Sequence, residues 1–352
     1  MTMQGKGQVE NVKDDLETRK TKAVALLSGG LDSNLAVRMM LEQGVEVEAI
    51  AIKTPFCDFD CGKGCGHRVR QVSADLGIHL KTVYFGDEYL KMLKNPKHGY
   101  GSGMNPCIDC RAMMYREAKK HMEQINADFI VTGEVLFQRP MSQNSRALRI
   151  IEEETDTTGK VLRPLTAKRL APTEAEKDCL VNRENLGGIK GRSRKNQLIL
   201  AKHFNIENPP NSAGGCLLTD PAFSKRVKDS FDHASGIPNL NDVELLRIGR
   251  HFRISSDAKL IVGRNMEENE KIKSLSTSED ILIEAMDYVG PTSLLRGEKL
   301  DERSIYASSG ITLRYSDSPK GIKCRVRALI QGKEEEIHVA SARHEEIVKL
   351  RI

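Results

Sequence analysis

The sequence of 352 residues contains no tryptophan, only 5% aromatic residues, no internal repeat and no low-complexity tract. No segment approaches the roughly 20 consecutive apolar residues that a membrane-spanning helix requires. The chain is 39% hydrophobic and 29% charged, a composition that excludes collagen-like and intrinsically disordered classes. We therefore expect a globular protein with no membrane partner.

The first 20 residues carry mixed charge and lack the apolar core of a secretory signal, which favours a cytoplasmic location. Thiols stay reduced in that compartment. We therefore expect the eight cysteines to act as metal ligands or catalytic groups before they act as disulfides.

Strand and helix patterns alternate from residue 22 onward. Short apolar runs bounded by turn residues predict buried strands at residues 23–27, 45–53, 80–85 and 128–132. Apolar residues at helical spacing predict helices at residues 34–43, 69–76 and 109–125. Strands that alternate with helices predict an α/β fold with a doubly wound parallel sheet.

The pattern changes beyond residue 146. A capping box of Thr173 and Glu176 predicts one helix start, and a second helix is expected at residues 195–204. Strands predicted at residues 252–254, 259–262 and 322–330 indicate a separate C-terminal α+β domain. We divide the chain into a polar extension at 1–20, a first domain at 21–155, a basic helical region completing it at 156–238, and the α+β domain at 239–352.

Six residues connect the first predicted strand to the first predicted helix: Ser28, Gly29, Gly30, Leu31, Asp32 and Ser33. Backbone N–H groups and the helix dipole converge on an anion in such a turn. The serines can donate to phosphate oxygens, and Asp32 can hold the Mg²⁺ that accompanies a nucleoside triphosphate. We expect ATP at this edge of the sheet, where open α/β folds bind ligands. The simpler alternative is a Gly-rich turn with a capping serine.

This six-residue pattern resembles that of the PP-loop ATP pyrophosphatase family, and the Walker phosphate loop is absent. The resemblance implies an adenine nucleotide alpha hydrolase-like fold and cleavage of ATP between its α- and β-phosphates. It also implies that AMP is transferred to a carbonyl oxygen of the substrate and then displaced by a nucleophile.

Three cysteines are candidates for holding that nucleophile. Cys107 and Cys110 form a C-x-x-C at a predicted helix start, where the dipole and Arg111 are expected to lower the thiol pKa, and Cys216 lies in a distant glycine turn. Thiolates are the soft ligands that iron–sulfur clusters and zinc select, and three would leave one metal position open for hydrosulfide. Two semi-buried thiols and an unrelated third are the alternative.

The PP-loop, the C-x-x-C and the third cysteine together resemble the tRNA-thiolating branch of the family, and residues 105–110 resemble a segment of bacterial 2-thiouridine synthases. The resemblance implies either a 4Fe-4S cluster on three cysteines or a persulfide relay. We favour the cluster because no thiol-carrier domain is evident. It further implies tRNA as substrate and a sulfur donor, either sulfide or a cysteine desulfurase.

A second trio, Cys57, Cys61 and Cys65, is followed by His67. A second metal site, with Zn²⁺ bound there together with His67, is one hypothesis. Its glycine-rich spacing favours a loop, so redox-tolerant thiols that shield the active site are the other hypothesis.

Further polar groups follow the fourth predicted strand at the same sheet edge. Gly133 and Glu134 are candidate nucleotide-binding residues, with Glu134 able to meet Mg²⁺, ribose or the target base. A capping carboxylate is the alternative for Glu134. Arg139 is a candidate phosphate contact in the next loop, or else an exposed loop arginine.

Positive charge gathers in residues 156–204, where eleven Lys and Arg face five Asp and Glu. The cluster of Arg192, Arg194 and Lys195 at a predicted helix start suits a nucleic-acid backbone, although a solvated helix face would look the same. Residues 252–257 and 261–265 are similar to the start of the NFACT RNA-binding domain. This similarity favours RNA over a small-molecule substrate.

These patterns predict an ATP-dependent tRNA sulfurtransferase that adenylates a uridine or cytidine carbonyl and displaces AMP with sulfur. Catalysis is expected from Asp32, Cys107, Cys110 and Cys216. One alternative is a PP-loop enzyme of small molecules, either an amidating ligase or a sulfur-inserting enzyme of cofactor synthesis. Another is a non-catalytic RNA-binding iron–sulfur protein. A homodimer is left open as the assembly.

Overall fold

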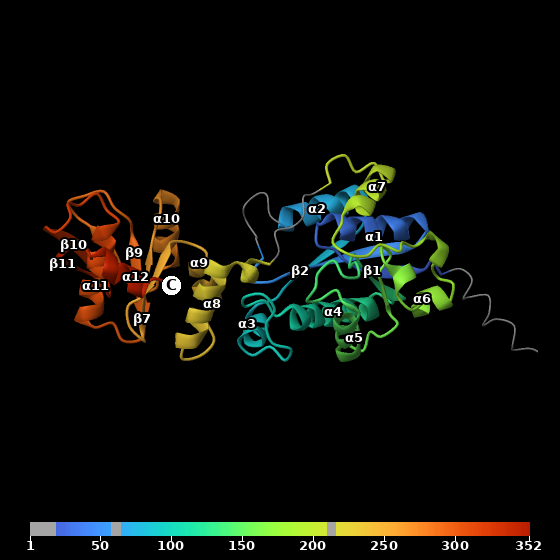
Figure 1. Ribbon diagram of the computed structural model, residues 1–352, viewed down its shortest axis with the longest axis horizontal. Coiled ribbons are helices and arrows are strands. Elements are labelled where there is room, and N and C mark those ends of the chain that lie inside the picture. The colour runs from blue at the N-terminus through green and yellow to red at the C-terminus, as the bar shows by residue number, and fades with distance from the viewer. Residues whose placement is uncertain (1–18, 58–64, 210–215) are drawn as a thin grey trace, which may run out of the picture. The chain divides into compact units, whose positions relative to one another are not determined.

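A computed structural model of the chain describes residues 19–57, 65–209 and 216–352, apart from the side chains of residues 65–67. The chain divides into two compact units (Figure 1). The first contains Met1–Phe85, Pro96–Gly101 and Pro106–Gly215, and the second contains Gly86–Asn95, Ser102–Asn105 and Cys216–Ile352. Among the described helices, none has both the length and the apolar character needed to cross a bilayer.

The first unit is built on a five-stranded parallel sheet with strand order β3-β2-β1-β4-β5. Its strands are β1 (Lys22–Leu26), β2 (Glu46–Lys53), β3 (Leu80–Tyr84), β4 (Phe129–Thr132) and β5 (Val161–Leu162). Every residue of β4 is buried, as expected for a central strand covered on both faces.

Helices cover both faces of this sheet, so the predicted doubly wound α/β fold is confirmed (Figure 1). They are α1 (Leu31–Glu42), α2 (Cys65–Leu76), α4 (Cys107–Gln124), α5 (Ser145–Glu154), α6 (Glu174–Lys177) and α7 (Lys195–His203). On one face, Leu35 of α1 and Ala201 of α7 share an apolar core, and on the other Tyr115 of α4 packs with Ile151 of α5. The capping box of Thr173 and Glu176 is present, but α6 continues for only one turn.

The strand order reverses between β1 and β4. The chain passes from β1 through α1 to β2 on one side, while β4 pairs with β1 on the other side. The carboxyl ends of β1 and β4 therefore form the topological switch point, where open α/β sheets bind ligands. Residues 28–33 and 133–134 leave these two strands at that point.

The second unit contains a six-stranded antiparallel sheet with the order β11-β10-β8-β9-β7-β6. Its strands are β6 (Arg250–Arg253), β7 (Ala258–Val262), β8 (Ile281–Ala285), β9 (Ser293–Gly297), β10 (Lys323–Ile330) and β11 (Lys333–Ala340). Its helices are α3 (Asp87–Lys94), α8 (Pro221–His233), α9 (Leu240–Leu246), α10 (Met266–Leu275), α11 (Glu302–Arg314) and α12 (His344–Leu350). The α+β class predicted for the C-terminal region is confirmed.

Seven described α-helices lie where the sequence patterns placed none: α3, α5 and α8 to α12. Three of them, α3, α5 and α8, bury only three apolar side chains each, for example Tyr89, Leu90 and Leu93 in α3.

Candidate active site

The PP-loop turns sharply between β1 and α1. Gly29 has a φ of 71°, and a Cβ atom there would lie 3.0 Å from the backbone nitrogen of Val69. The Ser33 hydroxyl donates to the carbonyl of Gly30 at 3.1 Å. No side chain caps α1, so the N–H groups of its first turn can bind an anion.

Asp32 lies half-buried in the first turn of α1. Its Oδ2 accepts a 2.9 Å hydrogen bond from Nε2 of Gln138, whereas its buried Oδ1 has no hydrogen-bond partner among the described residues. Burial raises the pKa of Asp32, and the Gln138 hydrogen bond and the Arg194 charge oppose this rise. An uncompensated carboxylate oxygen of this kind fits a Mg²⁺ ligand.

Gln197 of α7 is a second unsatisfied group, which sequence reasoning missed. It is fully buried, and neither atom of its amide has a partner with hydrogen-bond geometry within the described part of the chain, although the amide lies close enough to Asp32 to lower the pKa of that carboxyl. Buried polar groups without partners are uncommon and costly. The only signal in the sequence was a polar residue at a core position of a helix, which periodicity alone does not distinguish from a surface residue.

Gly133 brings the end of β4 against the PP-loop. A Cβ atom at Gly133 would lie 2.4 Å from the backbone nitrogen of Ser33 and 2.5 Å from the carbonyl carbon of Asp32. Any side chain at this position would push the two segments apart. The structure thus brings Gly133 to the loop of residues 28–33.

Glu134 is held in a buried network. Its Oε2 accepts hydrogen bonds from the Tyr115 hydroxyl at 2.5 Å and from Nε of Arg163 at 3.1 Å, and its Oε1 lies 3.6 Å from Nε of Arg111. Burial raises its pKa, but Arg111 and Arg163 outweigh burial and hold the pKa below the usual value. Glu134 is therefore an ionised partner of two arginines, and its role as a ligand stays a prediction.

Cys107 and Cys110 occupy the first turn of α4, and both are half-buried. Burial raises the pKa of Cys107, with Arg111 and Arg139 acting in the opposite direction. The expectation of a lowered thiol pKa is therefore wrong for Cys107, because desolvation exceeds the attraction of the nearby cations. Asp109, between them, accepts hydrogen bonds from the backbone nitrogens of Lys97 and His98.

Of the other predicted cysteine ligands, the structure describes the side chains of Cys57 and Cys216. Cys216 is the first residue of the last segment of the second unit and is half-buried, as is Cys57, whose sulfur lies 3.3 Å from the Thr54 hydroxyl. Cys61 and the side chain of Cys65 lie outside the described residues. In residues 19–57, 65–209 and 216–352, no three His, Cys, Asp or Glu side chains gather as a metal site, so cluster and zinc ligation stay predictions.

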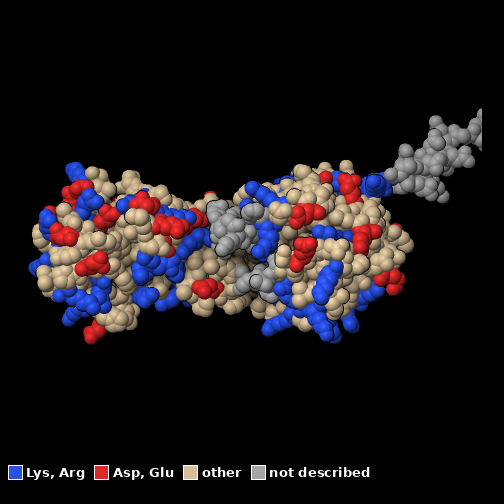
Figure 2. Space-filling model, turned by 90° about the horizontal axis from the view of Figure 1, so that it is seen from above, with Lys and Arg blue, Asp and Glu red and all other residues tan. Residues whose placement is uncertain are grey.

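The predicted basic cluster faces solvent only in part. Arg192 and Lys195 are exposed, whereas Arg194 is half-buried and its charge acts on Asp32. The surplus of positive charge counted in residues 156–204 includes Arg163, which is buried between Glu134 and Glu152. Figure 2 shows Lys and Arg side chains interspersed with Asp and Glu on the visible face of the first unit.

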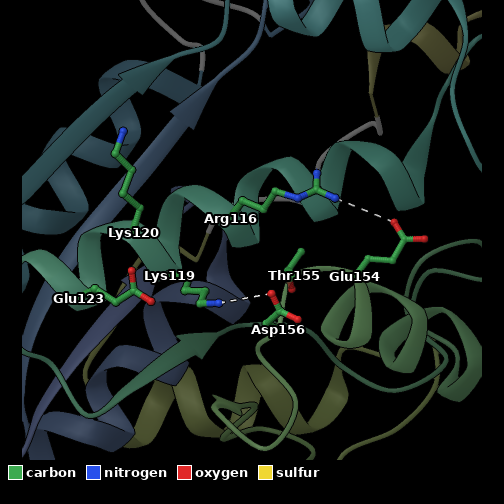
Figure 3. Close-up of a pocket in the computed structure, with 7 residues that line it drawn as sticks. All are labelled: Arg116, Lys119, Lys120, Glu123, Glu154, Thr155 and Asp156. Carbon is green, nitrogen blue, oxygen red and sulfur yellow. Dashed lines mark ion pairs between the residues drawn. The ribbon is translucent and has the colours of Figure 1, made fainter.

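A surface pocket lies at the ends of α4 and α5, with about 260 Å³ of space (Figure 3). Its lining is Arg116, Lys119, Lys120, Glu123, Glu154, Thr155 and Asp156. Lys119 pairs with Asp156 at 3.6 Å and Arg116 with Glu154 at 4.0 Å, so much of its charge is compensated internally. It contains none of the residues 28–33, and we assign the nucleotide to the switch point instead.

Two families match parts of the chain. Residues 18–171 match the family described as thiamine biosynthesis protein (ThiI), and residues 249–351 match the NFACT protein RNA binding domain. The first match contains the PP-loop and the C-x-x-C, and the second covers most of the antiparallel sheet unit.

Several similar proteins are tRNA-specific 2-thiouridylases named MnmA. The one from Stutzerimonas stutzeri is 26% identical over 243 residues, which cover 66% of this chain and 60% of the relative. The one from a Wolbachia pipientis strain is 21% identical over 347 residues, covering 90% of each chain. The chain thus spans less than two thirds of the length of the first of these relatives.

Solved structures give weaker likenesses. A 4-thiouridine synthetase in complex with RNA and ATP is 24% identical, with 53% of this chain and 52% of that chain covered and a TM-score of 0.34. The tRNA thiolase NcsA of Methanococcus maripaludis, solved with its 4Fe-4S cluster, is 18% identical, with 66% and 72% covered and a TM-score of 0.33. These scores are too low to show a shared overall arrangement. The sequence matches thus make residues 18–171 similar to the ThiI family and residues 249–351 similar to the NFACT RNA binding domain, and the MnmA tRNA thiolases are similar to the chain at 21–26% identity.

Proposed function

We propose that this protein is an ATP-dependent tRNA sulfurtransferase. The observation that carries the proposal is the PP-loop at the β1/β4 switch point, where, among the residues that the structure describes, no side chain caps α1 and one carboxylate oxygen of Asp32 has no hydrogen-bond partner. The match of residues 18–171 to the ThiI family and the similarity to 2-thiouridylases support the same activity.

The first step is the transfer of AMP to the substrate. The N–H groups at the start of α1 and the hydroxyls of Ser28 and Ser33 bind the triphosphate, while Asp32 holds Mg²⁺. A carbonyl oxygen of the target base attacks the α-phosphorus, the bond to the β-phosphate oxygen breaks, and pyrophosphate leaves. The carbonyl oxygen is then part of AMP, a good leaving group.

The second step replaces that oxygen with sulfur. A sulfur nucleophile held at Cys107, Cys110 and Cys216 attacks the base carbon, and the carbon–oxygen bond to AMP breaks. Cys107 and Cys110 lie one helical turn apart at the start of α4, and this donor set fits two ligands of an iron–sulfur cluster. A bound 4Fe-4S cluster would supply an open iron position for sulfide. Zn²⁺ at Cys57, Cys61 and Cys65 is a further part of the proposal.

The substrate and location complete the proposal. The match of residues 249–351 to an RNA-binding family and the exposed Arg192 and Lys195 support tRNA as partner. The target base must leave its stack to reach the switch point. Sulfide or a cysteine desulfurase supplies sulfur, and the reaction takes place in the cytoplasm.

The experiment measures two products from the full chain incubated with tRNA, Mg²⁺-ATP and sulfide. Pyrophosphate release is followed in solution, and thionucleosides are identified by mass spectrometry of digested tRNA. We expect both in the native protein, and Cys216→Ala should retain ATP binding and lose the thionucleoside. Cys324→Ala, at a buried cysteine of the RNA-binding unit, is the matched control. Pyrophosphate release with no RNA dependence would favour a small-molecule enzyme.

A further inference from the structure

Phe137 is an exposed aromatic residue in a strained conformation at the candidate active site. It follows β4 by five residues, its side chain is 51% exposed, and its φ is 64°. Left-handed backbone is unfavourable for a bulky residue, and such strain persists only when the surroundings impose it. An exposed side chain gains little from packing, so core formation does not explain a phenylalanine here.

The surrounding turn fixes this conformation. The nitrogen of Phe137 donates to the carbonyl of Gln143 at 2.6 Å, and the nitrogen of Gln143 donates to the carbonyl of Arg139 at 2.8 Å. The buried Gln143 side chain accepts from the nitrogen of Arg139 at 3.1 Å. The ring is therefore carried by a closed turn, and little backbone freedom is lost when a ligand contacts it.

The turn connects the catalytic edge with the basic segment. Gln138, the next residue, donates to Asp32, and Leu136, the residue before, pairs with Lys190 and accepts from the nitrogen of Gly191 at 2.8 Å. Phe137 is thus attached on one side to the Asp32 carboxylate and on the other to the segment that continues into Arg192.

An exposed aromatic ring suits a nucleic-acid base. Every base offers a π-face, and stacking on aromatic side chains is the usual way in which proteins hold unstacked bases. Arg139 lies two residues after Phe137 and Lys190 pairs with the preceding Leu136, and such cations suit the phosphates beside a base. An apolar protein partner would gain nothing from these charges.

We propose that Phe137 is the platform on which a nucleobase of the RNA substrate stacks while its neighbour is presented to Asp32 and ATP. This inference rests on the proposed function, because it names the residue that receives the RNA. The strained backbone is retained because it keeps the ring exposed.

The test separates the ring from the backbone strain. Phe137→Gly removes the ring and relieves the left-handed strain, so we expect thermal stability to stay equal or rise. We expect kcat/KM for tRNA to fall about tenfold to a hundredfold, the range of a lost base–aromatic stack, with Mg²⁺-ATP affinity unchanged. Phe137→Trp should retain activity. Met141→Ala, which removes another exposed apolar side chain of the same turn, is the control.

A binding measurement makes the test independent of catalysis. A tRNA transcript containing 5-iodouridine is irradiated with the full chain, and cross-linked peptides are sequenced. We expect a cross-link at Phe137 that Phe137→Gly abolishes and Met141→Ala retains. Unchanged cross-linking and kcat/KM in Phe137→Gly would overturn the proposal, and so would a loss confined to ATP affinity, which would place adenine on the ring. A native protein that cross-links at Phe137 without thiolating tRNA would instead contradict the proposed function.

Discussion

Gly133 and Ser33 approach so closely that a Cβ atom on Gly133 would lie 2.4 Å from the Ser33 nitrogen. The contact joins the end of β4 to the first turn of α1 at the strand-order reversal. Because backbone meets backbone, neither side can rotate away as a flexible side chain would. The close approach therefore fixes the distance between the end of β4 and the predicted nucleotide-binding loop.

We expect Gly133→Ala to weaken Mg²⁺-ATP binding and to reduce the free energy of unfolding by about 1–3 kcal/mol, the usual cost of overpacking. Isothermal titration calorimetry and urea titration measure the two effects. Gly188→Ala is the control, because a Cβ there would meet the Lys168 Cβ at 3.5 Å and Nε of Arg169 at 3.7 Å, both ordinary contact distances. If Gly133→Ala bound ATP as tightly as the native chain, the end of β4 and the first turn of α1 could move apart without weakening ATP binding.

We expect the Gln197→Met variant to be more stable than the native chain but to bind Mg²⁺-ATP more weakly. The amide of Gln197 is buried and has no partner with hydrogen-bond geometry among the described residues, so replacing Gln197 by the apolar Met should raise the free energy of unfolding by about 1–3 kcal/mol. The same change should lower Mg²⁺-ATP affinity, because the amide lies beside Asp32. Gln143→Met is the matched control for stability. It loses the hydrogen bond from Arg139 and should be less stable than the native chain. A less stable Gln197→Met would contradict a binding role for the amide.

Local sequence patterns predicted the strands and helices that meet at the site, but they did not predict ion pairs between residues far apart in the sequence. Ser28 to Ser33 could be placed because a strand, a Gly-rich turn and a helix are contiguous in sequence. Arg163 was counted as a surface cation, yet it lies buried between Glu134 and Glu152. Such a pairing depends on tertiary packing between β4, α5 and the segment after β5, which neither periodicity nor charge counting encodes.

Because the ammonium group of Lys259 is buried, we expect the stability of the protein to rise with pH in the alkaline range. Lys259 pairs with Asp229 at 3.3 Å, but Asp229 also binds Arg253, and burial lowers the pKa of Lys259 to about 8. The unfolded chain keeps its lysine proton up to about pH 10.5, so between pH 8 and pH 10.5 the unfolded state binds more protons than the folded state. Stability from this group therefore rises with pH across that window, by up to about 3 kcal/mol.

Urea titrations from pH 7 to pH 10.5 measure this dependence. Lys259→Met should remove the rise and be at least as stable as the native chain at pH 7, since Arg253 still neutralises Asp229. The exposed Lys228→Met is the control and should keep the rise. A native profile that is flat above pH 8 would mean that Lys259 titrates normally.

Because Glu134 is an ionised partner of two arginines, we expect its protonation at low pH to destabilise the protein. The pKa of Glu134 is held below the ordinary 4.5 by Arg111 and Arg163 despite burial. The stabilisation is therefore fully present above pH 4.5 and is lost as pH falls through the lower pKa of the folded state. Glu134→Gln should reduce the free energy of unfolding at pH 7 by about 3–5 kcal/mol, because the buried Arg163 and the half-buried Arg111 lose their shared partner.

Urea titrations between pH 3 and pH 7 distinguish this electrostatic effect from lost packing. Glu134→Gln should show a shallower decline with acid than the native chain, because the titrating group is gone. The double variant Glu134→Gln with Arg163→Met should recover part of the stability lost at pH 7, since it removes one of the uncompensated charges. The exposed Glu123→Gln serves as the control and should follow the native profile. Equal acid slopes in Glu134→Gln and the native chain would assign the acid sensitivity to other carboxylates.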